Sequence, residues 1–255
     1  MRDPVQYSRF SNERSRPFFE LLERIPQHDF KRIVDLGCGS GELTVSISER
    51  WPDARVTGTD NSPQMLTKSG AYEIDGRLDF LEQAIQDYDE PADLIFANAA
   101  LQWVGDHPAI FPKLAALVNP GGVLAIQMPF SHVQPSHRLL EETARNGPWA
   151  SMLADWQRFQ VQDLSWYVEL LMGLGFAVDA WETTYYFVLQ GDDPVLEWVK
   201  GTSLQPILNR LDESERVQFT REYAERLRKA YPPTPQGTIY PFRRIFFIAS
   251  RNQAP

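Results

Sequence analysis

Residues 31–44 read KRIVDLGCGSGELT, and this stretch decides the fold. Its first half is a short β-branched run that ends in an acid, Asp35. Three alternate glycines follow, and apolar residues then resume at helical spacing. A strand, a glycine turn and a helix in this order let the backbone approach a ligand where a Cβ atom would collide. The stretch therefore predicts a ligand-binding strand–turn–helix unit.

The glycine spacing differs from that of a dinucleotide-binding loop. Such a loop would place its third glycine at position 42, which is Glu42 in this chain. Asp35, Gly37, Gly39 and Gly41 instead form a D-x-G-x-G-x-G pattern, which resembles motif I of class I methyltransferases. Their cofactor, S-adenosylmethionine, has an ammonium group and a sulfonium cation and no pyrophosphate, so an acidic loop suits it. We expect these four residues to bind this cofactor.

Strand-like and helix-like segments alternate regularly over residues 32–128, which predicts a parallel sheet with helices on both faces. Further strands are predicted at 54–60, 78–84, 92–101 and 123–128, helices from Ser62 and Pro108, and a turn at 119–122. Two β-rich runs, 183–189 and 245–250, are expected to form an antiparallel edge of the same sheet. The predicted fold class is α/β: Rossmann-like, with a mostly parallel seven-stranded sheet, an antiparallel final strand and a helical substrate cover.

The chain is predicted to be one domain, residues 1–255. Its core is expected at 30–130 and 175–255, and the helical cover at about 130–175 and 192–232.

The composition is that of an acidic globular protein. A formal net charge of −9 argues against nucleic acid as a partner, since nucleic-acid binders usually carry a basic surface. One cysteine excludes an intramolecular disulfide and a multi-cysteine metal site, so we expect no metal. The N-terminus is too polar for a signal peptide and no apolar run is long enough for a membrane helix. We expect a cytoplasmic protein without membrane contact, and its oligomeric state stays open.

Other cofactor contacts are expected where the strands end. Asp60 lies about 20 residues beyond the glycine loop, where an acid accepts hydrogen bonds from ribose hydroxyls. Asn61 and Met65 are assigned to the same region. The family resemblance places the adenine near Ala84 and Ile85, although many relatives have an acid at the first of these positions.

The segment after the fourth strand matches the corresponding methyltransferase motif. By this resemblance, the Asn98 carbonyl and Ala99 would face the methionine ammonium of the cofactor. Trp103 has two interpretations, a cover over the cofactor and a core residue.

The resemblance narrows to one family. Four stretches are similar to trans-aconitate 2-methyltransferases: YSRFSNERSRPFFELLERI (7–25), FANAALQWVGDHPAIFPKL (96–114), LVNPGGVLAIQMPFSHVQPSH (117–137) and RRIFFIAS (243–250). The resemblance implies transfer of a methyl group from S-adenosylmethionine to one carboxylate of trans-aconitate, giving a monomethyl ester and S-adenosylhomocysteine.

A carboxylate acceptor needs no catalytic residue, because it is already ionised and nucleophilic at neutral pH. Catalysis would come from orientation and proximity. Arginine suits the binding of a tricarboxylate because its planar fork matches a carboxylate. The predicted substrate-binding residues are Tyr7, Arg14, Arg16, Gln127, His132, Tyr240 and Arg243, with Arg9, Arg244 and His137 as further candidates.

Two other functions stay open. One is methyl transfer to an amine, phenol or carbon, which would usually require a proton acceptor such as His132. The other is a non-catalytic module that binds S-adenosylmethionine. The glycine spacing disfavours a nicotinamide-dependent dehydrogenase. The negative net charge disfavours a nucleic-acid methyltransferase.

Overall fold

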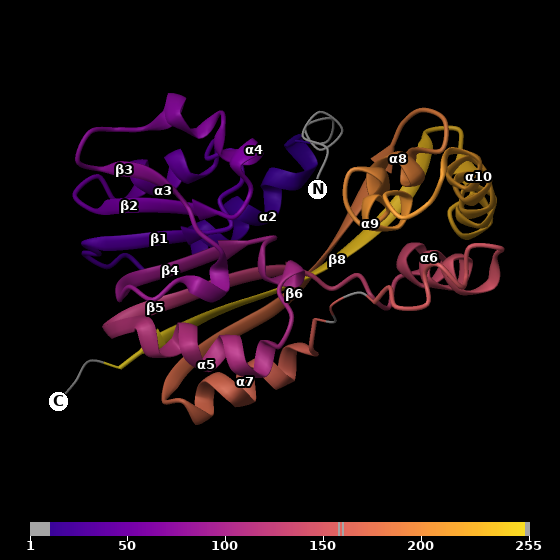
Figure 1. Ribbon diagram of the computed structural model, residues 1–255. Helices are drawn as coiled ribbons and strands as arrows, with labels where there is room; N and C mark the ends of the chain where they lie inside the picture. Colours follow the sequence, from indigo (N-terminus) through magenta and orange to yellow (C-terminus); the bar gives the residue numbers. More distant parts are fainter. Residues whose placement is uncertain (1–10, 158, 160, 253–255) are drawn as a thin grey trace. The chain divides into compact units, whose positions relative to one another are not determined.

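The computed structural model describes residues 11–157, 159 and 161–252, which divide into two compact units (Figure 1). Unit 1 is built mainly from residues 130–157 and 184–243, and unit 2 from residues 15–129, 161–183 and 244–252. Strands β6 (Phe176–Leu189) and β8 (Gly237–Arg251) each run from one unit into the other. The single-domain boundaries predicted from the sequence stay a prediction.

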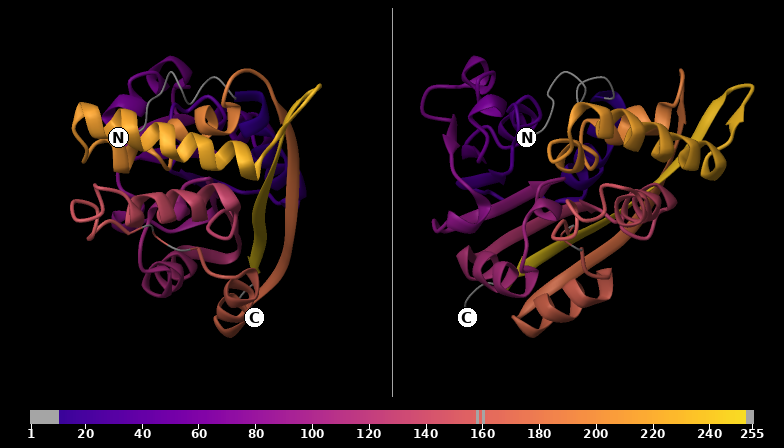
Figure 2. Two further views of the ribbon diagram at one scale, coloured as in Figure 1. Left: turned by 90° about the vertical axis from the view of Figure 1, so that its right-hand side faces the viewer. Right: turned by 45° about the vertical axis from the view of Figure 1, so that its right-hand side comes forward.

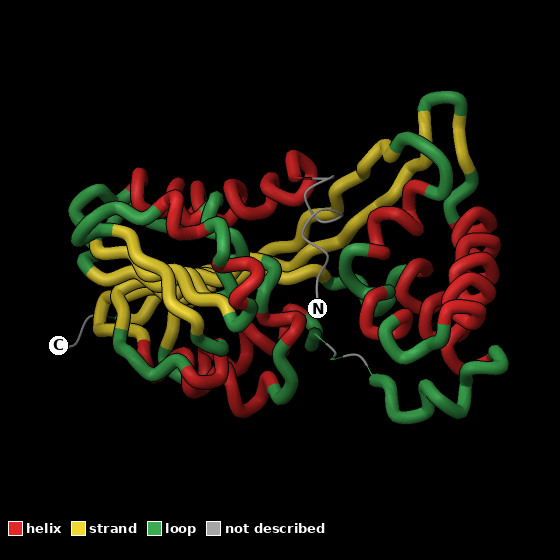
Figure 3. The backbone as a smooth tube through the Cα atoms, turned by 45° about the horizontal axis from the view of Figure 1, so that its top comes forward, coloured by secondary structure: helices red, strands yellow, loops and turns green. Residues whose placement is uncertain are grey.

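Unit 2 holds the predicted alternation of strands and helices, with helices on both faces of the sheet (Figure 3). In chain order its elements are α2 (Ser11–Arg24, whose first turn groups with unit 1), β1 (Arg32–Leu36), α3 (Thr44–Arg50), β2 (Arg55–Asp60), α4 (Pro63–Leu66), η1 (Ser69–Tyr72), β3 (Leu78–Glu82), η2 (Ile85–Asp87), β4 (Ala92–Asn98), η3 (Leu101–Trp103), α5 (His107–Leu117), β5 (Val118–Pro129) and α7 (Leu164–Gly173).

The sheet confirms the predicted fold class. Its strand order among the described residues is β3-β2-β1-β4-β5-β8-β6, and a short strand, β7 (Pro233–Thr234), pairs with β8. The pairs among β1 to β5 are parallel, whereas β8 runs antiparallel to β5 from Pro129↔Arg244 to Val123↔Ser250. The C-terminal ends of β1, β2, β4 and β5 therefore reach one edge, where open α/β sheets bind ligands.

Both faces of the sheet in unit 2 are packed with aromatic side chains. On one face, Phe18 of α2 lies 5.1 Å from Phe96 of β4, measured between ring centroids. On the other, Phe111 of α5 and Tyr167 of α7 contact Phe247 of β8 at 5.8 and 5.2 Å. Burial on both faces explains why β1, β4 and β5 are nearly continuous apolar runs.

Two segments differ from the sequence predictions. The turn expected at 119–122 is instead part of β5, which begins at Val118 and has a register shift opposite Ala92 and Leu94. Gly122 permits this because a Cβ atom there would lie 2.7 Å from the carbonyl oxygen of Asp93. The segment 164–173, expected in the cover, forms α7 of unit 2 because its aromatic side chains pack under β8.

Unit 1 is mainly helical, as predicted for the cover. Its helices are α6 (Pro135–Asn146), α8 (Pro194–Lys200), α9 (Gln205–Leu208) and α10 (Glu213–Ala230). Helices α6 and α10 lie side by side in both views of Figure 2. A capping box at Asp212 and Glu215 begins α10, and Trp149 packs against Phe219 at 4.9 Å. Over the described part of the chain, no helix is both long and apolar enough to span a bilayer.

A buried hydrogen-bond chain joins α5 to α7. His107 Nε2 lies 3.0 Å from the Leu101 carbonyl oxygen, which can only accept, so Nε2 carries the hydrogen and donates. In a neutral ring the other nitrogen, Nδ1, then accepts from the Tyr167 hydroxyl at 2.5 Å. Burial lowers the His107 pKa, which agrees with a neutral ring. The same hydroxyl of Tyr167 accepts a hydrogen bond from the backbone N–H of Gln162 at 3.0 Å. One phenol oxygen thus satisfies two buried groups.

Tyr167→Phe is expected to lower the free energy of unfolding by about 2 kcal/mol, because it removes the partner of two buried polar groups without changing the packed ring. Urea denaturation measures this loss. The control is Tyr186→Phe, since Tyr186 is 69% exposed and its substitution should change stability little. Equal effects of the two substitutions would contradict a special role for the buried hydroxyl.

Candidate functional site

The glycine loop is fixed to the end of β2 by three hydrogen bonds, and a fourth holds the residues that follow β2. The amides of Gly37 and Cys38 both donate to the Thr59 carbonyl oxygen, at 2.7 and 2.9 Å. The Gly39 amide donates to Oδ2 of Asp60 at 3.0 Å, and Oδ1 of the same carboxylate accepts from the Ser62 amide at 2.9 Å. Asp60 therefore positions the loop in addition to its predicted contact with ribose, a role that the sequence analysis did not identify.

The three glycines are required for different reasons. All three have positive φ angles of +63° to +79°, which disfavour any other residue. A Cβ atom at Gly37 would lie 2.4 Å from the Ala100 side chain, and one at Gly41 would lie 2.6 Å from the Phe80 ring. A Cβ atom at Gly39 would have no neighbour within 4 Å. Packing occupies the space beside the outer glycines, whereas the middle one faces open space that a ligand can enter.

Asp35 lies buried beneath the loop at the end of β1. Only 4% of its surface is exposed, and the Thr44 hydroxyl donates to its Oδ2 at 2.7 Å. Burial raises its pKa to about 7, and the nearby Asp60 carboxylate adds to the rise while the Thr44 hydrogen bond opposes it. A nearby cation would favour the ionised form, so the site is suited to a positively charged ligand.

The other predicted cofactor residues lie around this loop in unit 2. Asn61 is exposed directly after β2, and Met65 is buried in α4. Ala84 is the N-cap residue of η2, and Ile85 packs near Gly37.

The end of β4 is strained. Ala99 has a φ angle of +52°, a conformation that costs a non-glycine residue about 1–2 kcal/mol. Two hydrogen bonds hold it: its amide donates to the Gln127 carbonyl at 3.0 Å, and the Gln102 side chain donates to its carbonyl at 2.7 Å. Strain of this kind gathers at ligand sites. Trp103, which follows, is 37% exposed, so the interpretation as a core residue is wrong.

These residues fit S-adenosylmethionine. The open space at Gly39 lets a ligand approach the backbone of the loop closely. The Asp35 and Asp60 carboxylates provide negative charge for the cationic groups of that ligand. Oδ1 of Asn98 is a buried acceptor with no hydrogen-bond partner among the described residues, which suits an ammonium donor. The loop and the end of β4 therefore carry acceptors suited to a ligand with cationic donor groups.

Two residues next to this edge form a buried polar pair. Arg244 of β8 is 4% exposed, and its Nη1 donates to Oε1 of Gln127 at 3.0 Å. Gln127 is fully buried on β5 and pairs in register with Asn98. Gln127 was predicted to bind substrate. Arg244 was a further candidate, and its burial was not predicted.

The predicted substrate residues are distributed over both units. Tyr7 and the side chain of Arg14 lie outside the described residues. Arg16 is exposed on α2 of unit 2. In unit 1, His132 packs edge-on against Phe130, and the Arg243 guanidinium lies 4.6 Å from the centre of the same ring. Their contacts with a substrate stay predictions.

Tyr240 is fully buried in unit 1, which disfavours its prediction as a substrate donor. Its hydroxyl lies 3.2 Å from Oγ of Ser136. The Ser136 amide donates to the Tyr231 hydroxyl at 3.0 Å, and its carbonyl accepts from Tyr223 at 2.8 Å. His137 Nδ1 lies 3.0 Å from the Ser136 hydroxyl. These contacts fix the beginning of α6 to α10 and β8, so Tyr240 has a structural role here.

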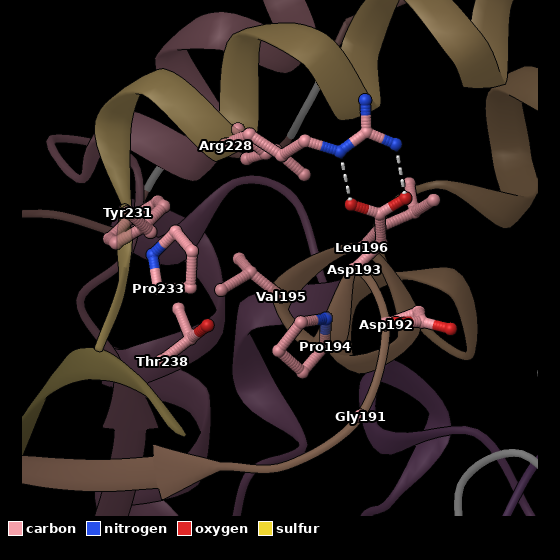
Figure 4. A pocket seen from close by; sticks show the side chains of 11 residues that line it. Gly191, Asp192, Asp193, Pro194, Val195, Leu196, Arg228, Tyr231, Pro233 and Thr238 are labelled. Carbon is pink, nitrogen blue, oxygen red and sulfur yellow. Dashed lines mark hydrogen bonds and ion pairs between the residues drawn. The ribbon is translucent and has the colours of Figure 1, made fainter. Parts of the chain in front are cut away.

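Unit 1 also contains a separate hollow of about 350 Å³ (Figure 4). Its floor includes Val195 and Tyr231. At its rim the Arg228 guanidinium makes two hydrogen bonds of 2.6 Å to the Asp193 carboxylate. Because that cation is already paired, the rim does not offer it to a carboxylate ligand. The described predicted site residues lie elsewhere.

The surroundings of Cys38 disfavour its thiolate form. Burial raises the pKa of its thiol, and the carboxylates of Asp35 and Asp60 raise it further. The thiolate is thus disfavoured, in agreement with its interpretation as a small loop residue. Within the described ranges, no cluster of three or more His, Cys, Asp or Glu side chains could hold a metal ion.

Comparisons with known proteins identify the family of the chain. The family model described as a methyltransferase domain matches residues 10–180. The trans-aconitate 2-methyltransferase of Streptomyces avermitilis is 48% identical over 98% of this chain and 97% of its own length. That of Azoarcus sp. is 40% identical over 98% of both chains.

Solved structures share the fold at low identity. The YcgJ protein of Bacillus subtilis matches with a TM-score of 0.58 and 14% identity over 93% of this chain and 98% of its own. Phosphoethanolamine N-methyltransferase 2 of Haemonchus contortus, in complex with S-adenosyl-L-methionine, matches with a TM-score of 0.58 and 17% identity. This match covers 98% of this chain and 56% of that one.

Asp35→Asn is expected to stabilise the ligand-free protein above pH 7. The folded pKa of about 7 exceeds the unfolded value of about 3.9, so the wild type loses stability as pH rises between these values. The gain should be a few kcal/mol at pH 8 and close to zero at pH 4. Thermal melting at both pH values measures it. The same substitution should weaken S-adenosylmethionine binding, and a variant that is stabilised equally at both pH values would contradict the assigned pKa.

Gly39→Ala and Gly41→Ala should separate binding from folding. At Gly39 the added methyl enters open space, so stability should fall only by the strain of the +63° φ angle, about 1–2 kcal/mol, while the dissociation constant for S-adenosylmethionine rises at least roughly tenfold, about 1.4 kcal/mol. At Gly41 the methyl collides with Phe80, so the fold itself should be destabilised. Calorimetric titration and melting curves test both, and unchanged cofactor affinity in Gly39→Ala would place the ligand elsewhere.

Proposed function

The chain belongs to the trans-aconitate 2-methyltransferase family of S-adenosylmethionine-dependent methyltransferases, and we propose that it methylates one carboxylate of trans-aconitate. The observation that carries this proposal is the 48% identity to the Streptomyces avermitilis enzyme over nearly the full length of both chains. The product would be a monomethyl ester.

The cofactor site is proposed to form around the glycine loop. Asp35 and the backbone of Gly37, Gly39 and Gly41 would receive the cationic part of the cofactor, and Asp60 the ribose. Ala84 and Ile85 would border the adenine, with Asn61 and Met65 beside them. Asn98 and Ala99 would receive the ammonium group, and Trp103 would cover it. Bound there, S-adenosylmethionine supplies an electrophilic methyl group, which a carboxylate oxygen accepts as the carbon–sulfur bond breaks.

The protein's contribution to the reaction is positional. A substrate carboxylate is ionised at neutral pH, so no side chain has to remove a proton. The residues around the site would hold the two reactants in line and exclude water. Holding reactants in the reactive orientation is itself a large source of rate enhancement. We therefore assign no catalytic acid or base. Arg16, Gln127, His132 and Arg243, together with Tyr7 and Arg14, are proposed to contribute to substrate binding.

The acidic composition bears on the partners that the protein lacks. The net charge of −9 disfavours binding to a phosphate backbone. We propose that the enzyme acts in the cytoplasm on a small-molecule acid, without a nucleic-acid or membrane partner.

The direct test is transfer from methyl-labelled S-adenosylmethionine to trans-aconitate, with cis-aconitate, isocitrate and citrate for comparison. We expect strong labelling of trans-aconitate, in a product that base hydrolyses as an ester. His132→Asn should retain kcat within about threefold, because a general base would contribute about 10²–10⁴-fold. No labelled acid in the presence of bound cofactor would refute the proposal, and loss of turnover in His132→Asn would favour an amine, phenol or carbon acceptor.

A further inference from the structure

We propose that Gln102 is a positioning residue for the cofactor. Its side-chain amide holds Ala99 in a left-handed conformation and so sets the end of β4 for the methionine part of S-adenosylmethionine. The proposal rests on the proposed function for the place of the cofactor, and it assigns to Gln102 no contact with the acid substrate.

The side chain of Gln102, which lies in η3, reaches back to the residue that follows β4. Its amide group lies 2.7 Å from the Ala99 carbonyl oxygen. A carbonyl oxygen can only accept, so the atom at this distance is the donor Nε2. The Ala99 amide in turn donates to the backbone carbonyl oxygen of Gln127 at 3.0 Å. Both backbone polar groups of Ala99 are therefore fixed by hydrogen bonds.

The backbone at residue 99 needs this support. Glycine adopts a φ angle of +52° without strain, whereas the Cβ atom of an alanine collides with the neighbouring backbone in this conformation. A hydrogen bond to each polar group opposes relaxation to an ordinary conformation. The bond from Gln102 is the one made by a side chain, so it is the one that a substitution can remove.

The conformation of Ala99 determines where its two neighbours in the chain lie. Asn98, directly before it, ends β4 and has the buried Oδ1 acceptor. Ala100, directly after it, is 4% exposed, and its side chain occupies the space that a Cβ atom at Gly37 would enter. A change of φ at residue 99 would redirect the chain between these two neighbours. It would therefore move the end of β4 relative to the glycine loop, and both border the expected cofactor site.

The far end of the same segment also has a left-handed residue. Asp106 has a φ angle of +54°, and its carboxylate accepts from the Ala109 amide at 3.3 Å. Asp106 thus has a polar side chain of its own that bonds to the backbone, as is common for aspartate in this conformation. Ala99 has none, so its support has to come from another side chain, and Gln102 provides it.

The other end of the Gln102 amide indicates that packing alone does not explain this residue. Its Oε1 atom is buried and has no hydrogen-bond partner among the described residues. A buried acceptor in that state costs free energy, which an apolar side chain at this position would avoid. The bond from Nε2 to Ala99 is the interaction that offsets this cost.

Gln102→Met tests the proposal, because it nearly keeps the length of the side chain and removes the donor. We expect the dissociation constant for S-adenosylmethionine to rise roughly tenfold, since one hydrogen bond that shapes the site is lost. KM for trans-aconitate at saturating cofactor should change less than about twofold, because this segment is assigned no substrate contact. Calorimetric titration and steady-state kinetics measure the two constants.

A second substitution, at residue 99, distinguishes positioning from packing. Glycine adopts the observed φ angle without the bond from Gln102. When Ala99→Gly is the reference protein, Gln102→Met should therefore raise the dissociation constant for S-adenosylmethionine less than about threefold, against roughly tenfold in the wild type. A loss caused by altered packing at position 102 would be the same in both backgrounds.

Hydrogen exchange provides a measurement that needs no cofactor. The amide hydrogen of Ala99 is bonded to the Gln127 carbonyl oxygen, so its exchange rate reports how often that bond opens. In the cofactor-free protein, Gln102→Met should speed this exchange at least roughly tenfold. The Trp51 amide, bonded to the Ile47 carbonyl oxygen at 3.2 Å beside α3, is the reference and should change much less.

The matched control is Gln190→Met. Nε2 of Gln190 also donates to a backbone carbonyl oxygen, that of Gln236, at 2.7 Å. Gln190 is exposed and belongs to unit 1, directly after β6. The same substitution there removes the same kind of hydrogen bond, and the dissociation constant for S-adenosylmethionine should stay within about twofold of the wild-type value.

Two results would overturn this inference. One is unchanged cofactor affinity in Gln102→Met, and the other is a loss of equal size in the Ala99→Gly background. If Gln102→Met does not fold, a double variant that folds and binds the cofactor would support the inference, because relief of strain at residue 99 would then be the cause of the rescue. Failure of both variants to fold would overturn it, since the core would then require Gln102 for reasons other than Ala99.

The same measurements distinguish this inference from the proposed function. A wild type that binds S-adenosylmethionine and labels no acid would refute the proposed acceptor alone, because cofactor affinity still decides the role of Gln102. A wild type that does not bind S-adenosylmethionine would refute both.

Discussion

The site depends on the carboxylate of Asp60 and the carbonyl of Thr59, which hold the glycine loop against the end of β2. Three positive-φ glycines would otherwise leave this loop conformationally free, and ordering them costs backbone entropy. The carboxylate serves two segments, since it also accepts from the amide of Ser62, where the next helix begins. The middle of the glycine loop and the beginning of α4 are thus fixed by one side chain. The open space at Gly39 follows from this arrangement.

Unit 2 contains buried groups of opposite charge that suit reactants of opposite charge. Asp35 is buried beneath the glycine loop at the end of β1, whereas Arg244 is buried on β8 beside Gln127. Burying either charged side chain in an apolar core would cost free energy unless a ligand or a polar neighbour compensated it, because burial disfavours the charged form of both groups. The two charged groups lie on different strands, β1 and β8.

The sequence identified those parts of the fold that depend on local patterns. The alternation of strands and helices, the glycine loop and Asp60 all have signatures within a few residues, and the sheet confirms the fold that they predicted. The sequence did not show which of Arg243 and Arg244 is buried. Both faces of β8 are apolar, so strand periodicity alone favours neither residue. Hydrogen bonds between distant residues, such as that from Thr44 to Asp35 or from Arg244 to Gln127, have no local signature. The extension of β5 through 119–122 was missed because an Asn-Pro-Gly-Gly run resembles a turn.

The position of β8 has a consequence for synthesis of the protein. This strand follows both β5 and β6 in the chain, yet it lies between them in the sheet. Until β8 is made, the nascent chain exposes the hydrogen-bonding edge of β5, an apolar strand whose free edge favours aggregation. Nor can β6 reach its place in the sheet, since its neighbour does not yet exist. Completion of the sheet must therefore await the synthesis of β8, and a message truncated before β8 would yield a chain with an unprotected edge.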